Sequence, residues 1–253
     1  MCLAVVALAT HPRYALVVAA NRDEYHARPA APAHWWPDGI LAGRDERASG
    51  TWLGSTREGR FALITNVREP GRNVAGAPSR GALVPRILRD PAGVRVASAN
   101  AARDAARYNG FNVIAGDLAA AYYFSNRHDG VVGMQRGVFG VANAALDEPW
   151  PKVVHARDEL TRWCARGDLD FAPVWAALAD RRQATEAELP ATGLAIERER
   201  VVSAAFIVDP VYGTRSSTLL AITHEGDATF IERSFDERGA QTREVTERYA
   251  LRR

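Results

Sequence analysis

Cys2 is the residue whose type and position best suit covalent chemistry. Cysteine is small enough for methionine aminopeptidase to remove Met1, and removal would place a free α-amine and a thiol on one residue. The amine titrates near ~7.7 to 8.0 and the thiol near ~8.5, so proton transfer between them costs only about 1 kcal/mol and the amine can serve as base. Considered without its neighbours, Cys2 is better explained as a small apolar residue that opens a buried strand.

A polar cluster, Asn21-Arg22-Asp23-Glu24, follows the apolar run from Tyr14 to Ala20. A turn centred on residues 11–12 would pair antiparallel positions whose numbers sum to about 23, which places Cys2 opposite Asn21 to within about 2 to 4 residues. Asp23 is then the natural partner of the amine, and Arg22 would favour the thiolate electrostatically. The alternative, preferred for a charge run taken alone, is a solvated turn with local salt bridges.

Three apolar strand candidates end in asparagine, namely in Asn21, Asn66 and Asn143. If these strand ends are neighbours, their carboxamides supply N–H donors for an oxyanion, each worth roughly 3 to 4 kcal/mol in a preorganised site. Asparagine also commonly terminates strands, and for any one of the three this is the better explanation. The three together near Cys2 favour an oxyanion-binding site.

Regular elements must hold these residues in place. The runs 2–9 and 14–20 predict a hairpin that is apolar on both faces and therefore covered on both sides, as in a layered sandwich. Further strands are predicted at 40–42, 51–55, 61–66, 111–115, 121–125, 138–142, 204–208, 217–223 and 229–233. Helices are predicted after a cap at Ser79, where Pro85 would kink or delay the helix, and at 94–108, 152–164 and 171–178. A loop over 21–36, a linker over 180–200 and a charged tail complete the prediction.

Composition limits the class of protein. The 253 residues, 47% hydrophobic and 25% charged, predict a single globular domain over 1–253. The formal charge of +2 and the absence of a basic stripe argue against nucleic acid as a partner. The apolar stretch at 2–9 lacks a basic leader and is cut short, which predicts neither a signal peptide nor a membrane span, and hence a cytoplasmic protein.

Other chemistry finds little support in the sequence. Cys2 and Cys164 form neither a disulfide framework nor a metal-ligand spacing, and no histidine pair has metal-binding spacing, so no metal or cofactor is expected. His26 could contact a ligand, although loop histidines are usually solvated. Three tryptophans could line an apolar ligand site, although packing is their more common role: Trp35, Trp36 and Trp52.

Several motifs together resemble the NRDE family, also called the transport and Golgi organisation protein 2 family. They are Met1-Cys2, Ala20-Asn21-Arg22-Asp23-Glu24, Ile64-Thr65-Asn66-Val67-Arg68, Ser79-Arg80-Gly81, Asn143 ahead of Pro149-Trp150-Pro151-Lys152, and Tyr212-Gly213-Thr214-Arg215-Ser216-Ser217-Thr218. The resemblance implies an α+β fold, a four-layer αββα sandwich of two mainly antiparallel sheets. This is the N-terminal-nucleophile hydrolase type, related to choloylglycine hydrolases and penicillin V acylases.

The resemblance also implies roles for particular residues. Its catalytic residues would be Cys2, Arg22, Asp23, Asn66 and Asn143, and its substrate-binding residues Asn21, Glu24, Tyr212 and Arg215. One departure is that Arg22 and Asp23 are adjacent and would point to opposite faces of an extended strand. Both can reach Cys2 only if the chain bends there.

Two functional hypotheses follow. The first is a cysteine amidohydrolase that cleaves the C–N bond of a linear non-peptide amide after removal of Met1. The second is a non-enzymatic binding or trafficking protein for haem, acyl-CoA or lipid that keeps the same scaffold, because activity does not follow from a fold. In either case the partner is a small molecule, without stable membrane insertion. The sequence makes no prediction of oligomeric state.

Overall fold

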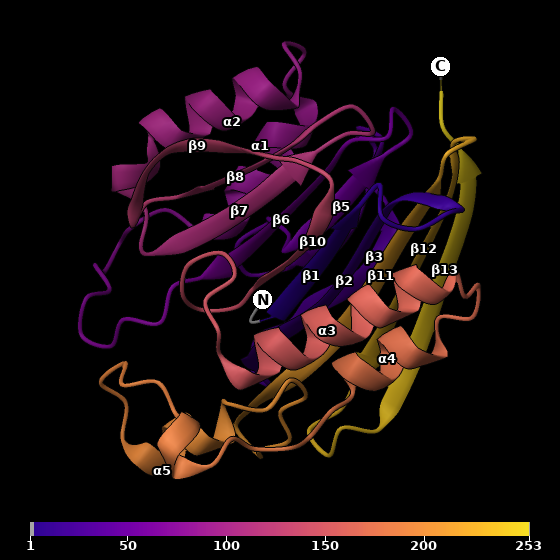
Figure 1. Cartoon of the computed structure of the whole chain (residues 1–253). Helices are drawn as coiled ribbons and strands as arrows, with labels where there is room; N and C mark the ends of the chain where they lie inside the picture. Colours follow the sequence, from indigo (N-terminus) through magenta and orange to yellow (C-terminus); the bar gives the residue numbers. More distant parts are fainter. Residues whose placement is uncertain (1–2, 253) are drawn as a thin grey trace.

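The computed structural model describes residues 3–252, so Cys2, the predicted nucleophile, lies outside the described residues together with Met1 and Arg253. Two antiparallel sheets stack face to face, and helices cover the outer face of each (Figure 1). The predicted four-layer αββα sandwich is therefore confirmed.

The first sheet, sheet A, has six strands. Their spatial order is β10 (Gly137–Val141), β1 (Leu3–Leu8), β2 (Tyr14–Tyr25), β11 (Tyr212–Thr223), β12 (Asp227–Phe235) and β13 (Gln241–Ala250). Alternate residues of the β1–β2 hairpin enter two different cores, Val6 and Val18 on the inner face and Val5 and Val17 on the helix face. The predicted hairpin is apolar on both faces because both of its faces are buried.

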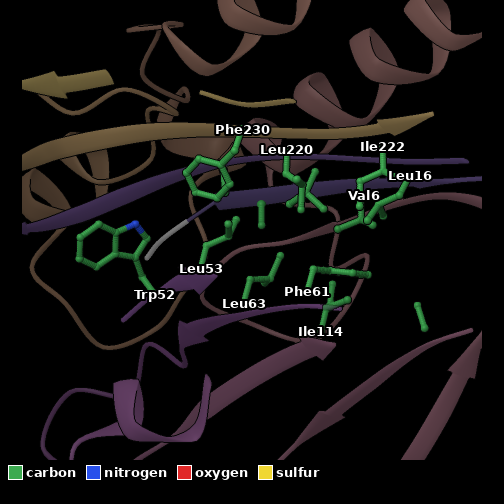
Figure 2. Close-up of a cluster of buried hydrophobic side chains, with 14 of the residues drawn as sticks. Val6, Leu16, Trp52, Leu53, Phe61, Leu63, Ile114, Leu220, Ile222 and Phe230 are labelled. Atoms are coloured by element: carbon green, nitrogen blue, oxygen red, sulfur yellow. The ribbon is translucent and has the colours of Figure 1, made fainter. Parts of the chain in front are cut away.

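The second sheet, sheet B, is a meander of seven strands in sequence order. It contains β3 (Ala30–Trp35), β4 (Ile40–Asp45), β5 (Leu53–Thr56), β6 (Phe61–Asn66), β7 (Phe111–Gly116), β8 (Ala121–Ser125) and β9 (His128–Met134). Figure 2 shows Leu53, Leu63 and Ile114 of sheet B pointing toward Leu220 and Phe230 of sheet A. These side chains form the core between the sheets.

Helices form the outer layers. The short η1 (Arg80–Ala82), α1 (Leu83–Arg89), α2 (Val94–Arg103) and η2 (Ala105–Arg107) lie over sheet B, whereas α3 (Pro151–Arg166) and α4 (Ala172–Leu178) lie over sheet A. Of the two effects predicted for Pro85, a kink or a delayed helix, the kink is not needed, because α1 begins at Leu83 and Pro85 occupies its first turn, where no intrahelical bond needs its missing N–H. Ser79 precedes η1 but its side chain makes no cap hydrogen bond.

The loop predicted over 21–36 is wrong. Strand β2 continues to Tyr25 because β11 pairs with it, so that Tyr212 lies opposite Tyr25 and Gly213 opposite Glu24. A partner strand satisfies the backbone of these polar residues as well as it would apolar ones. The later part of the same stretch forms β3.

Three further predictions differ from the structure. The strand predicted at 204–208 is not formed; these residues lie in an irregular segment, in which Ala204 to Ile207 are buried. The charged tail is the edge strand β13, where charge on the open side of a sheet discourages pairing with other chains. The linker at 180–200 contains η3 (Glu186–Glu188) and the start of α5 (Ile196–Val201), and β9 was not predicted.

Candidate functional site

A cavity of about 410 Å³ lies where strands of the two sheets end. The end of β2, the end of β6, the segment before η1 and the irregular segment around α5 line it. Four predicted catalytic residues are among the lining residues: Arg22, Asp23, Asn66 and Asn143. Of the predicted substrate-binding residues, Glu24 and Tyr212 line the cavity as well.

A β-bulge lies opposite Arg22 and Asp23, which both line the cavity. Asp23 pairs with Thr214 and Arg22 with Ser216, which leaves Arg215 as an extra residue on β11. A bulge of this kind bends the strand and increases its local twist. The irregularity of the sheet thus falls where the sequence required a bend, next to Arg22 and Asp23.

Asp23 is held by its neighbours on β11. The Thr214 hydroxyl donates to Asp23 Oδ1 at 2.6 Å, and the Tyr212 hydroxyl donates to the Asp23 carbonyl at 3.3 Å. Thr214 also accepts a hydrogen bond from the Ile207 N–H at 2.9 Å. Asp23 as a whole is only 3% exposed, so these contacts fix the orientation of its carboxylate at the cavity wall.

Arg22 is a buried cation with an aromatic neighbour. Its side chain is 4% exposed, and its guanidinium carbon lies 4.4 Å from the centre of the Trp52 ring. Burial lowers the pKa of Arg22, and the charges of Glu24 and Asp45 oppose that shift. The guanidinium nevertheless stays charged, because arginine does not lose its proton in proteins. Trp52 lines the cavity, whereas Trp35 and Trp36 do not.

Asn66 and Asn143 meet across the two sheets. The Asn143 amide Nδ2 donates to the Asn66 carbonyl at 3.0 Å and to Asn66 Oδ1 at 3.1 Å. Arg68 Nη2 lies 3.3 Å from Asn143 Oδ1, and Arg68 Nη1 forms an ion pair with Glu199 at 2.5 Å. Because Asn143 Oδ1 faces a cation, its amide must face Asn66. Asn143 therefore orients Asn66, with Arg68 as its support.

Asn21 lies elsewhere. Its amide Nδ2 donates to the carbonyls of Leu178 at 2.8 Å and Ala205 at 2.7 Å, and its Oδ1 accepts from Ser217 at 2.6 Å. Leu3 pairs with Asn21, so partner numbers sum to one more than the hairpin prediction. The Asn21 side chain points toward the helix layer and does not line the cavity. Two of the three strand-end asparagines therefore come together, and the third does not.

Arg215 also does not line the cavity. Its Nη1 donates to the His26 carbonyl at 2.7 Å, and the His26 ring contacts the Asp209 carbonyl at 2.9 Å. The bulge thus turns Arg215 toward the loop after β2. Glu24, in contrast, lies at the cavity wall, 3.7 Å from Arg28.

Basic residues that were given no role in the sequence also line the cavity. Lys152 is 5% exposed and donates to the Val202 carbonyl at 2.9 Å, and Arg80 donates to the Gly110 carbonyl at 3.0 Å. Arg198 lies 3.4 Å from Asp209 and stacks at 5.2 Å on Tyr212. These three residues lie in segments distant from one another in sequence. Arg80 and Lys152 stand in motifs that the sequence analysis quoted, whereas no signal in the sequence indicated Arg198.

Within residues 3–252, no three His, Cys, Asp or Glu side chains gather in a way that could hold a metal ion. Among the helices of the same range, none has the length and apolar character needed to cross a bilayer.

Solved structures define the class of fold. The chain is similar to a conjugated bile acid hydrolase variant from Clostridium perfringens, with 8% identity and a TM-score of 0.56 over 99% of this chain and 97% of the other. It is also similar to the Caenorhabditis elegans ortholog of N-acylethanolamine-hydrolyzing acid amidase, with 11% identity and a TM-score of 0.50 over 87% and 92% of the chains. The fold is that of the N-terminal-nucleophile hydrolases.

The family follows from sequence comparison. The model of the Transport and Golgi organisation 2 family matches residues 1–237, and the chain belongs to this family. The homologue from Bos taurus is 32% identical over 244 residues, and that from Homo sapiens is 31% identical over 240 residues, each covering 87% of both chains. The family resemblance inferred from the motifs is confirmed.

Proposed function

We propose that the protein is an N-terminal cysteine amidohydrolase that cleaves the C–N bond of a linear non-peptide amide after Met1 is removed. One observation carries the proposal: Arg22 and Asp23 of β2, Asn66 of β6 and Asn143 after β10 all line one cavity, although they come from three distant parts of the chain. Cys2 precedes Leu3, and Leu3 pairs with Asn21, the residue next to Arg22. The similar solved structures carry the names of a bile acid hydrolase and an amidase, which supports the same reaction class.

The reaction would proceed through a thioester. The Cys2 sulfur attacks the amide carbonyl carbon while the thiol proton passes to the α-amine. Collapse of the tetrahedral intermediate breaks the C–N bond, and the α-ammonium returns that proton to the leaving amine. Water, deprotonated by the same α-amine, then attacks the thioester carbonyl. The acid leaves, and the cysteine sulfur regains a proton.

The described residues would serve this reaction in distinct ways. The Asp23 carboxylate would hold the ammonium, and the Arg22 guanidinium would favour the thiolate. Asn66 turns Oδ1 toward Asn143, so its Nδ2 group lies on the opposite side of the carboxamide and would donate to the oxyanion. Asn143 would act as a positioning residue, since its own amide is engaged by Asn66.

Intact mass and a substrate screen test the proposal. Native protein should lack the mass of one methionine, and it should hydrolyse some member of a panel of N-acyl fluorogenic amides. Cys2→Ser and Cys2→Ala should abolish this activity. Cys164→Ser is the matched control, because Cys164 is 3% exposed in α3 and does not line the cavity. Retention of Met1, or hydrolysis by Cys2→Ala, would contradict the proposal.

A carrier function has support from the composition of the cavity. Basic residues such as Lys152 and Arg198 share its wall with apolar Ile64 and Leu194, a combination that suits an anionic amphiphile. No His, Met or Cys is among the described lining residues, so acyl-CoA or a lipid fits this wall better than haem. Ligand binding without turnover, and unchanged in Cys2→Ala, would favour the carrier.

A further inference from the structure

Glu232 is a buried acid that links the two sheets. It lies on the inner face of β12 and is 1% exposed. Its Oε1 accepts a hydrogen bond from the Ala33 N–H of β3 at 2.7 Å, and its Oε2 accepts from the Thr218 hydroxyl of β11 at 3.2 Å. A carboxylate that ties sheet A to the edge of sheet B has no role in the reaction described above.

The groups around Glu232 are neutral except for Arg22. Thr218 and Val245 lie opposite it on β11 and β13. On β4, Gly43 leaves room, since a Cβ there would lie 3.2 Å from Glu232 Oε2 and 2.4 Å from the Trp52 ring. Asp45, the acid of that strand, is bound by Arg28 at 2.6 Å. Arg22 is the charged group whose field acts on the Glu232 carboxylate.

Burial raises the pKa of Glu232 to about 7, and the hydrogen bonds from Ala33 and Thr218 and the charge of Arg22 limit the rise. Arg22 and Glu232 do not form an ion pair within 4.0 Å among the described residues. The charges that act on Arg22 itself come from Glu24, Asp45, Arg28 and Arg215. The Glu232 carboxylate therefore lies in the field of Arg22 without pairing with it, and its ionisation is balanced near neutral pH.

The Arg22 guanidinium lines the cavity and can take an acceptor there. Within residues 3–252 it makes no hydrogen bond to a side chain or a carbonyl, although the residue is only 4% exposed and lines the cavity. A guanidinium has five N–H donors, and buried donors are nearly always paired with protein, water or ligand. A guanidinium placed in this way, stacked over the Trp52 ring, is suited to bind one carboxylate or oxyanion.

We propose that Arg22 recognises an anionic group of the ligand, and that Glu232 couples binding of this anion to the uptake of one proton. The bound anion offsets the charge of Arg22, which in the free protein favours the ionised form of Glu232. Its own negative charge then favours the protonated form of Glu232. The ligand class is a small amphiphile with a carboxylate or another monoanionic group. The inference does not require hydrolysis, and it holds for an enzyme and for a carrier.

The sign of the pH dependence follows from linkage. Binding is strongest when Glu232 is already protonated, and it weakens as the pH rises through about 7, where the free protein loses that proton. When two binding events are coupled in this way, the affinity for the ligand typically differs by about fivefold or more between the protonated and the ionised protein. Uptake should reach at most one proton per ligand.

Calorimetric titration with sodium hexanoate, and with hexanamide as a neutral control of equal length, tests the proposal at about pH 6 and pH 8. Hexanoate stays ionised at both pH values. We expect wild-type protein to bind hexanoate about fivefold or more tightly at pH 6 than at pH 8. Its binding enthalpy should vary with the ionisation heat of the buffer. Hexanamide should show no pH dependence.

Variants locate the two groups. Glu232→Gln should bind hexanoate equally at both pH values, with the wild-type affinity at pH 6. Arg22→Leu should bind about tenfold or more weakly at both. Glu247→Gln is the matched control, because Glu247 lies on the neighbouring strand β13 and contacts the Trp35 indole at 3.2 Å. It should keep the wild-type pH dependence.

Several outcomes would overturn the proposal. The first is equal binding of hexanoate and hexanamide, and the second is a wild-type pH dependence in Glu232→Gln. The third is a loss of the pH dependence in Cys2→Ala, which would make Cys2 the titrating group. If Arg22→Leu does not fold, the comparison of hexanoate with hexanamide on wild-type protein still decides. Failure of the hydrolase proposal appears separately, as absence of turnover with proton-linked binding intact.

Discussion

Asn21 and Arg22 are adjacent in β2, yet the structure treats them in opposite ways. The Asn21 carboxamide makes three hydrogen bonds to the protein on the helix face of sheet A. The Arg22 guanidinium, on the inner face, makes none to any residue within 3–252 and lines the cavity. One polar cluster in the sequence thus supplies both a residue that holds the fold together and a cation that lines the cavity.

This difference shows how the residues of a polar cluster on a strand can be separated into structural residues and ligand-binding residues. Successive side chains of a strand point to opposite faces, so neighbours in sequence enter different environments. A buried polar group whose hydrogen bonds all go to the protein stabilises the fold, whereas one without acceptors is prepared for a ligand. By this criterion Asn21 belongs with α4 and the irregular segment around 205, and Arg22 belongs with Glu232 and the cavity.

The largest effect on stability is expected from Asn21→Ala. The substitution leaves the Leu178 and Ala205 carbonyls without their donor and Ser217 without its acceptor. Each buried unsatisfied group costs about 1 to 3 kcal/mol, so the free energy of unfolding should fall by roughly 4 kcal/mol in urea titrations. Asn73→Ala, at an exposed position, is the control and should change it by less than about 0.5 kcal/mol. If Asn21→Ala and Asn73→Ala lower the free energy of unfolding equally, Asn21 is not a structural residue.

The next effect concerns Glu232→Gln and pH. The pKa of Glu232 rises from 4.5 to about 7 on folding, so the folded state binds the proton more tightly. This contribution to stability is complete below about pH 4.5 and is lost as the pH rises through about 7. The variant lacks that loss, so relative to wild type it should gain about 3 kcal/mol between pH 4.5 and pH 8. A difference in unfolding free energy that stays constant with pH would show that Glu232 does not titrate in this range.

Thr214→Val should have an intermediate effect. Valine keeps the shape but removes the hydroxyl that donates to Asp23 and accepts from the Ile207 N–H. We expect a loss of about 2 kcal/mol in unfolding free energy, because a hydrogen bond to a charged group contributes about 1.5 to 3 kcal/mol. Thr214→Ser keeps the hydroxyl and should recover most of that loss. If serine is no better than valine, Asp23 is held by other contacts.

Arg215→Ala should have the smallest effect. Arg215 faces His26 and not the cavity, so its removal should cost about 1 kcal/mol in stability and change hexanoate affinity by less than about twofold. Arg22→Ala, measured in parallel, should weaken hexanoate binding about tenfold or more. A weakening of equal size in Arg215→Ala would mean that the bulge presents Arg215 to the ligand.

Much of the fold could be predicted from local pattern. The apolar runs that became β1, β6, β7 and β8 were located to within one or two residues, and the helical spacing of Val153, Ala156 and Leu160 predicted α3. The errors share a cause: where the residues are polar or mixed, strand formation depends on a partner. Thus β13 and the end of β2 exist because β12 and β11 pair with them.

The candidate site was predicted only in part. Asn66 and Asn143 were found because strand ends carry turn residues that a sandwich brings to one edge. Glu232 was missed, although it has the same strand parity as Ala228 and Phe230, both of which enter the core. Parity alone does not say which face is buried, since Ile231 lies on the other side and is apolar too.

By itself, the sequence determined the strand-length apolar runs, the hairpin at the start of the chain and the family, because these depend on order along the chain and on residue type. The tertiary structure alone decided which face each polar residue of 21–24 would occupy, where β11 would bulge and that an acid from β12 would be buried between the sheets. These outcomes depend on register and on the approach of distant strands, and a change of register by one residue moves every side chain to the other face.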